Sequence, residues 1–370
     1  MAKALFIIII IFLLFPLQAL AIYDPLSVPN NKFGIHILEP NEIEKATELV
    51  NSSGGDWGYV TIPIRANDRD LDKWVKFMNM CREKRIIPIL RIATFPLDGG
   101  WAAPNEYDLI DFANFLNELP WPIKNRYIIV YNEPNHQGEW GGFVYPQEYA
   151  RVFDRAVDIF KAESHDYFMI IAGMDAAATD SPTSANEYRY FRQMASTVPA
   201  VFTKADGLSS HSYGNPDFSS APNIYSRINI AAFRYERDFI CRNFQRCNMP
   251  IFITEAGWSA KNLSDDVIKD NYLFAWRNVW QDEFVVAVTP FIFDAREGPF
   301  SEFSFVDDNF RLKSFAENLK SLPKVRGSPI PASINDPARV ITENTSRQSN
   351  SSQWGDLWIR ITSFFTRLLL

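Results

Sequence analysis

The chain alternates between short apolar runs and longer segments in which apolar residues recur every three or four positions. Nearly continuous runs such as "IIPILRI" and "RYIIVY" are typical of parallel strands that helices cover on both sides. The longer segments, such as "PQEYARVFDRAVDIFKAE", have the period of amphipathic helices. The eight predicted strands are Phe33–Leu38, Tyr59–Ile64, Ile86–Ile92, Tyr127–Tyr131, Phe168–Ala172, Gly207–Ser212, Pro250–Thr254 and Val288–Phe293.

Strand and helix patterns repeat eight times between Phe33 and Leu322, which predicts the α/β fold class with a (β/α)₈ TIM barrel. One of the helices is expected to begin after the cap-like sequence that starts at Ser264. The alternative fold is an open, doubly wound sheet. Such a sheet would be large at eight strands and would be expected to have a glycine-rich first turn, which this chain lacks. The pattern therefore favours the barrel.

The N-terminal segment differs from the barrel pattern. Residues 1–21 have the features of an export signal, because Lys3 precedes an apolar run from Leu5 to Phe15 and the small-residue pattern "ALA" precedes Ile22. An uncleaved membrane anchor is the alternative, but the eleven apolar residues are fewer than the ~20 that a spanning helix needs. We therefore expect the protein to be exported to the extracellular space or the cell surface.

The catalytic domain predicted at 22–323 is followed by two further segments. Residues 324–353 are rich in Pro, Ser and Asn, which predicts a disordered linker. Residues 354–370 place apolar side chains at helical spacing, which predicts a short amphipathic C-terminal helix. This helix could dock on the barrel, pair with a partner or contact a membrane surface. The oligomeric state does not follow from the sequence.

Composition narrows the possible ligands. The formal net charge is −7 and the isoelectric point about 5.3, so the chain lacks the basic character of a nucleic-acid-binding protein. Its four histidines show no metal-binding spacing and it has no glycine-rich phosphate motif, so neither a metal nor another cofactor is predicted. Cys241 and Cys247 are close enough in sequence for a disulfide, and Cys81 is expected to be buried and free. Three free thiols are the alternative.

Two glutamates follow predicted strands at equivalent positions. Glu133 follows the fourth strand in "YNEPN", and Glu255 follows the seventh strand in "ITEAGW". In a parallel barrel, chemistry collects where strands end, and the 122 residues between positions 133 and 255 fit three strand–helix units of about 41 residues each. Pro134 is expected to keep Glu133 extended. Both carboxyl groups should therefore face one mouth of the barrel, where such a pair can cleave a glycosidic bond.

The motifs "YNEPN" and "ITEAGW", on the fourth and seventh of eight strands, resemble the acid/base and nucleophile signatures of clan A glycoside hydrolases, the retaining (β/α)₈ β-glycosidases that include families 5 and 39. The resemblance covers about Phe33 to Leu322. It implies that Glu133 is the general acid/base and Glu255 the nucleophile, and that Asn132 binds the 2-hydroxyl of an oligo- or polysaccharide. A catalytically inactive glycan-binding barrel is the alternative, although the two facing carboxylates favour the enzyme.

Three polar side chains near other strand ends are expected to support the glutamates. Arg91 lies in an apolar run, where a buried cation needs an anion, so Glu255 is its expected partner; Arg65 is a rival for that role. His211 and Tyr213 alternate after the sixth strand and therefore share a face. We expect Tyr213 to donate a hydrogen bond to Glu255, and His211 to bind a sugar hydroxyl or orient the acid/base.

Aromatic residues in the loops after predicted strands are candidates for stacking on sugar rings. Trp258 is the first choice, Trp140 is also assigned to substrate binding, and Trp101 has a similar position. Many clan A members end the eighth strand with a tryptophan, whereas this chain has phenylalanines there, at Phe291 and Phe293. Further candidates for the mouth of the barrel are His36, Glu39, Asp175 and Asp294.

Overall fold

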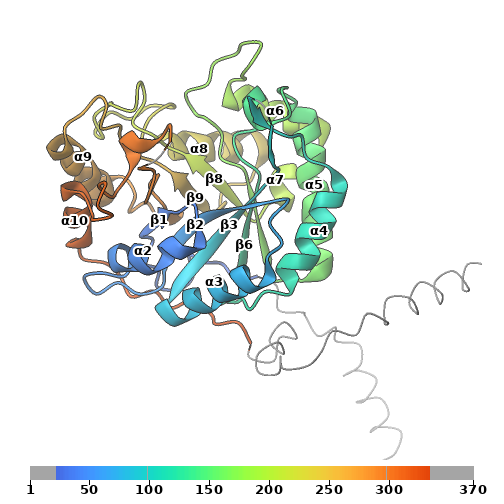
Figure 1. Cartoon of the computed structure of the whole chain (residues 1–370). Helices are drawn as coiled ribbons and strands as arrows, with labels where there is room; N and C mark the ends of the chain where they lie inside the picture. Colours follow the sequence, from blue (N-terminus) through green and yellow to red (C-terminus); the bar gives the residue numbers. More distant parts are fainter. Residues whose placement is uncertain (1–21, 98, 297, 334–370) are drawn as a thin grey trace, which may run out of the picture.

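The computed structural model describes residues 22–97, 99–296 and 298–333. The strands of the main sheet are β1 Gly34–His36, β2 Gly58–Arg65, β3 Ile86–Ala93, β6 Arg126–Val130, β7 Tyr167–Ile171, β8 Gly207–His211, β9 Ile251–Glu255 and β10 Val285–Val288. They pair in this order, all parallel, and a bridge between Phe33 and Val288 joins the first strand to the last. Helices surround the strands (Figure 1), so the predicted (β/α)₈ barrel is confirmed.

The helices in the described residues are α2 Ile43–Val50, α3 Leu71–Lys84, α4 Glu106–Asn117, α5 Pro146–Glu163, α6 Glu187–Thr197, α7 Val201–Lys204, α8 Ala232–Phe244, α9 Asp265–Asn278 and α10 Ser314–Lys320. Four of them begin where a side chain accepts a hydrogen bond from a free backbone amide of the first turn. Asp70, Asn105 and Asn186 cap α3, α4 and α6, and Ser264 caps α9 as the sequence predicted. Short elements in the loops are β4 Pro96–Leu97, β5 Gly100–Trp101, and the 3₁₀ helices η1 Pro40–Glu42, η2 Gln137–Glu139 and η3 Ser301–Phe303.

Aromatic rings fill the interior of the barrel. The ring of Tyr127 on β6 lies 5.0 Å from that of Phe168 on β7 and 5.3 Å from that of Phe252 on β9, centroid to centroid. Tyr59 and Ile87 belong to the same buried cluster. The interior is therefore solid, and the strand ends that carry the polar residues are supported from below.

The last strand lies earlier in the chain than predicted. Seven of the eight predicted strands coincide with observed ones, but the eighth was predicted at Val288–Phe293 and is observed at Val285–Val288. Phe291 and Ile292 instead belong to a small apolar cluster with Phe303 and Tyr213. This run is apolar because it packs inside a loop at the mouth of the barrel, and periodicity does not distinguish such a loop from a buried strand.

The first part of the predicted linker belongs to the barrel. The amide of Gly327 donates to the carbonyl of Asp56, the amide of Ser328 donates to the carbonyl of Pro29, and the amide of Lys124 donates to the carbonyl of Ile330. The prediction of a disordered linker was therefore wrong for residues 324–333, because backbone hydrogen bonds fix a segment whose composition resembles that of a linker. The predicted signal at 1–21, the remainder of the predicted linker and the predicted helix at 354–370 lie outside the described residues.

The cysteines form the predicted disulfide and not the alternative of three free thiols. Cys241 and Cys247 form a disulfide at the end of α8, and Cys81 is buried in α3 as a free thiol. Within the described residues, none of the helices combines the length and the apolar character that crossing a membrane requires.

Candidate active site

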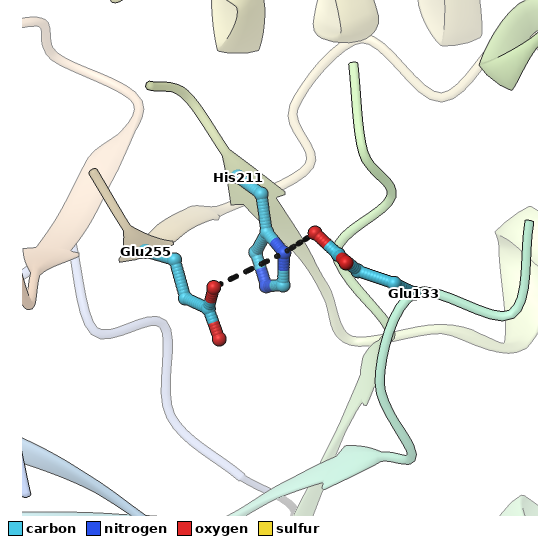
Figure 2. A group of neighbouring side chains, drawn as sticks. All are labelled: Glu133, His211 and Glu255. Carbon is cyan, nitrogen blue, oxygen red and sulfur yellow. Dashed lines mark hydrogen bonds and ion pairs between the residues drawn. The ribbon is translucent and has the colours of Figure 1, made fainter. Parts of the chain in front are cut away.

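Three strand ends bring Glu133, His211 and Glu255 together at the mouth of the barrel (Figure 2). His211 is the last residue of β8, Glu255 is the last residue of β9, and Glu133 follows the end of β6. One carboxylate oxygen of each glutamate and one ring nitrogen of His211 all lie within 4.8 Å of one another. His211 Nδ1 is 2.7 Å from Glu133 Oε1 and 3.7 Å from Glu255 Oε2. The two glutamates thus share one mouth, as their spacing predicted.

Glu133 lies in a tight turn instead of the predicted extended conformation. Its φ is +30° and that of Tyr131 is +70°, a region of backbone conformation that residues other than glycine rarely adopt. The amide of Glu133 donates to the carbonyl of Gly173, and its carbonyl accepts from the amide of His136. These hydrogen bonds outweigh the extended preference that Pro134 imposes. Backbone strain of this kind costs about 1–3 kcal/mol and is concentrated at functional sites.

Glu255 is a buried carboxylate that several donors surround. Arg91 Nη1 donates to Oε1 at 2.6 Å, Tyr213 Oη donates to Oε2 at 2.9 Å, and His36 Nδ1 lies 3.8 Å from Oε1. Burial alone would raise the pKa of Glu255, but the charges of His211 and Arg91 outweigh burial and lower it to about 2. Glu255 is therefore ionised at neutral pH, as a nucleophile must be.

His211 connects the two carboxylates. Burial alone would lower its pKa, but the charge of Glu255 and the hydrogen bond with Glu133 outweigh burial and raise the pKa above its ordinary value. Gly173 makes room for the imidazole, because a Cβ at that position would lie 2.3 Å from His211 Cδ2. The 2.7 Å hydrogen bond between His211 Nδ1 and Glu133 Oε1 therefore holds the two side chains together.

A third carboxyl group, Glu139 in η2, lies beside this pair. Its side chain is hydrogen-bonded to Asn132, and Arg91 Nη1 also donates to Asn132 Oδ1 at 2.6 Å. Burial and the charge of Glu133 raise the pKa of Glu139 to about 7. Glu139 was not predicted from the sequence, because the one signal for it was a position in the same loop as Glu133, and sequence alone does not fix which way a loop side chain points.

A cavity of about 460 Å³ opens above these groups. Arg65, Trp101 and Asp175 line it together with Arg91, Asn132, Glu133, Glu139, Tyr213 and Glu255. Asp175 Oδ2 is 2.8 Å from His136 Nε2. Four predicted mouth residues do not line this cavity: His36 and His211, which are buried beside Glu255, and Glu39 and Asp294. Glu39 flanks η1 and Asp294 pairs with Arg296.

The two tryptophans predicted to bind sugar are buried in the protein. Trp140 is 1% exposed, and its Nε1 donates to Glu148 Oε2 at 2.8 Å. Trp258 is also 1% exposed, and its Nε1 donates to the carbonyl of Ser220 at 2.7 Å. Neither ring lines the cavity. The prediction that Trp140 and Trp258 stack on substrate was therefore wrong, because each ring anchors its loop to the barrel instead of facing solvent.

Glutamate and histidine side chains also serve as metal ligands in proteins. Glu133, His211 and Glu255 offer ligand-type atoms close enough to share an ion. However, the ring nitrogen of His211 that faces Glu133 is already hydrogen-bonded to it, and a metal on that nitrogen would have to break this hydrogen bond. The arrangement therefore suits acid–base and nucleophilic chemistry better than metal binding.

Solved structures with the same fold exist, although the chain matches no known protein family in sequence and no curated protein is similar to it. A family 39 glycoside hydrolase from Bacteroides cellulosilyticus is 16% identical to this chain, with a TM-score of 0.54. The match covers 82% of this chain but only 65% of the length of that protein. A GH128 endo-beta-1,3-glucanase from Sorangium cellulosum is 13% identical (TM-score 0.54; 79% of this chain and 98% of that one). An endo-beta-1,4-glucanase from Xanthomonas axonopodis pv. citri is 12% identical, with a TM-score of 0.52, and the match covers 78% of this chain and 97% of that one. The chain therefore shares the (β/α)₈ fold of these three proteins.

Proposed function

We propose that the chain is a retaining β-glycoside hydrolase that cleaves O-glycosidic bonds of an oligo- or polysaccharide. The observation that carries the proposal is the approach of a Glu133 carboxylate oxygen and a Glu255 carboxylate oxygen to within 4.8 Å. The two carboxyl groups lie ~5–5.5 Å apart in retaining glycosidases, against ~6.5–9.5 Å in inverting ones. A gap this short supports a covalent intermediate over the direct attack of a water molecule in an inverting mechanism.

In the first step, ionised Glu255 attacks the anomeric carbon and forms a glycosyl-enzyme ester. Glu133 gives its proton to the glycosidic oxygen as the bond to the leaving group breaks. His211 holds the Glu133 carboxyl group in position through the 2.7 Å hydrogen bond. Asn132, fixed by Arg91, is the proposed partner of the sugar 2-hydroxyl.

In the second step, Glu133 is a carboxylate and takes a proton from a water molecule, which attacks the anomeric carbon and releases Glu255. The donors Arg91 and Tyr213 stabilise the departing carboxylate, which makes Glu255 a good leaving group. Because each step inverts the anomeric centre, the product keeps the configuration of the substrate.

Export remains part of the proposal. The disulfide between Cys241 and Cys247 supports it, because such bonds persist in oxidising compartments. A secreted or surface-bound enzyme would meet polysaccharides that do not enter the cell.

The test is the release of reducing sugar from a panel of β-linked polysaccharides and aryl β-glycosides. The parent protein is compared with Glu133→Gln, Glu255→Gln and the control Glu317→Gln, which changes an exposed glutamate of α10. We expect both active-site variants to lose at least about 1,000-fold in rate and the control to match the parent. NMR of the first product should detect the β-anomer.

Three outcomes would contradict the proposal. An α-anomer as first product would indicate inversion, and activity that survives in Glu255→Gln would exclude this residue as the nucleophile. A parent protein that binds glycans but cleaves none of the panel would indicate a glycan-binding barrel without activity.

A further inference from the structure

One side of the cavity consists of phenylalanine rings. Phe218, Phe291, Phe300 and Phe303 all line the cavity, and we call these four residues the phenylalanine wall. The ring centroids of Phe218 and Phe303 are 5.1 Å apart, those of Phe291 and Phe300 are 5.3 Å apart, and those of Phe291 and Phe303 are 6.0 Å apart. The wall is therefore one continuous surface, although its members come from the loop after β8, the segment after β10 and the region of η3.

Two members of the wall remain open to solvent. The side chain of Phe300 is 48% exposed and that of Phe218 is 36% exposed, whereas Phe291 and Phe303 are nearly buried. Phe291 and Phe303 belong to a small apolar cluster that is separate from the main core. An apolar group laid against the wall would remove these exposed rings from water, and burial of apolar surface is the main source of binding free energy in such a place.

The wall offers almost no hydrogen-bonding groups. Phenylalanine has no polar side-chain atom. The ring of Tyr213 packs against Phe218 and Phe303, but its hydroxyl already donates to Glu255. A sugar ring carries a hydroxyl group on most carbons, and each one needs a partner when it is buried. Polar partners lie elsewhere in the lining, at residues such as Arg65, Glu139 and Asp175. A phenylalanine ring can stack on the apolar face of a sugar but cannot pair its hydroxyl groups. The lining is thus divided into a polar part that can pair sugar hydroxyls and an apolar part that cannot.

We propose that the phenylalanine wall is a subsite for an apolar group that the substrate carries beside its sugar. The group is either an alkyl or aryl aglycone or an acyl substituent on the sugar, since both present the same apolar surface. The sugar part of this inference rests on the proposed function, but binding of the apolar group to the wall does not require that the bond be cleaved.

The first experiment measures binding without hydrolysis. Alkyl 1-thio-β-glucosides, in which sulfur replaces the glycosidic oxygen, are titrated into the full-length protein by calorimetry with methyl, butyl, hexyl and octyl chains below their micellar concentrations. Each fully buried methylene group strengthens binding about fourfold, so the octyl compound should bind at least about tenfold more tightly than the methyl compound even with partial burial. A second series carries acyl chains of increasing length on the 6-hydroxyl of methyl 1-thio-β-glucoside and distinguishes a sugar substituent from an aglycone.

Two variants test whether the wall is the site. Phe300→Ala removes the most exposed ring, and Phe218→Asn removes the second while suiting its φ of +52°, a conformation that asparagine tolerates. Both should flatten the dependence on chain length. The matched control is Phe143→Ala, which removes a 57% exposed phenylalanine that does not line the cavity and should leave the dependence unchanged.

The outcomes separate this inference from the proposed function. Equal affinity for the methyl and octyl compounds, or the same slope in the parent and in both wall variants, would overturn the subsite. Binding that strengthens with chain length and depends on the wall supports the subsite even if no glycoside is cleaved. Hydrolysis of glycosides with no dependence on chain length in either series would retain the glycosidase and reject the subsite.

Discussion

At the residue scale, the charge of Glu255 depends on a few donors, and Tyr213 is the one that can be changed with least effect on shape. Tyr213→Phe loses the 2.9 Å hydrogen bond but keeps the ring that packs near Phe291 and Phe303. A hydrogen bond to a charged group contributes about 1.5–3 kcal/mol, so kcat/KM should fall about 10- to 100-fold. The pKa of Glu255 should rise, and the acidic limb of the pH profile should move to higher pH. Initial rates between pH 3 and pH 8 measure both effects.

The control for this experiment is Tyr272→Phe, which removes a hydroxyl from a buried tyrosine that does not line the cavity. It should leave the pH profile unchanged. If Tyr213→Phe retained the parent's acidic limb, the hydroxyl of Tyr213 would have no part in keeping Glu255 ionised.

Residues on strands were easier to predict from sequence than residues in loops. Arg91 lies in a strand and Glu255 ends one, so the apolar pattern fixed which end of the barrel they occupy. Trp140 and Trp258 lie in loops, where the direction of a side chain depends on packing that the sequence pattern does not encode. Phe300 also lies in a loop and was not predicted from the sequence for the same reason.

At the scale of elements, the turn after β7 must approach β8 closely for the site to form. Gly173 permits this approach, since a Cβ there would lie 2.3 Å from His211 Cδ2 and 2.8 Å from Ser209 Oγ. Gly173→Ala should therefore displace the imidazole from Glu133 and lower kcat about 10- to 100-fold, because small misplacements at a reacting centre have effects of this size. Overpacking should also lower the free energy of unfolding by about 1–3 kcal/mol. Steady-state kinetics and urea unfolding measure the two effects.

Gly138→Ala provides a matched comparison near the same mouth. The nearest atom to an added Cβ there is the carbonyl oxygen of Gly99 at 3.8 Å, which is ordinary contact. This variant should resemble the parent in rate and stability. Full activity in Gly173→Ala would show that the site tolerates movement of His211.

The elements that sequence predicted well are those with a repeating pattern. Seven strands and the capped start of α9 follow from periodicity and capping chemistry. The misplaced eighth strand and the ordered segment at 324–333 are held by contacts distant in sequence, such as the hydrogen bond between the amide of Ser328 and the carbonyl of Pro29. Local patterns carry no information about such contacts.

At the scale of the whole molecule, two buried carboxyl groups link the helical layer to the barrel. Glu187 begins α6 and Glu236 lies in α8, and their side chains are hydrogen-bonded to each other. Ser210 Oγ on β8 donates to Glu236 Oε1 at 2.9 Å. Burial raises the pKa of Glu236 to about 7. Burial and the charge of Glu236 together raise the pKa of Glu187 above its ordinary value. The fold therefore retains a proton that the unfolded chain releases at lower pH.

This retained proton makes the stability of the barrel depend on pH. Between about pH 4.5, the ordinary pKa of a glutamate, and about pH 7, the folded state binds more protons than the unfolded state, so stability falls as the pH rises. Glu236→Gln stays neutral and still accepts from Ser210, so it should match the parent near pH 5 and exceed it by up to about 3 kcal/mol at pH 8. Urea unfolding at both pH values measures this, with exposed Glu317→Gln as the control. A difference between variant and parent that is the same at both pH values would mean that the pair does not hold its proton through this range.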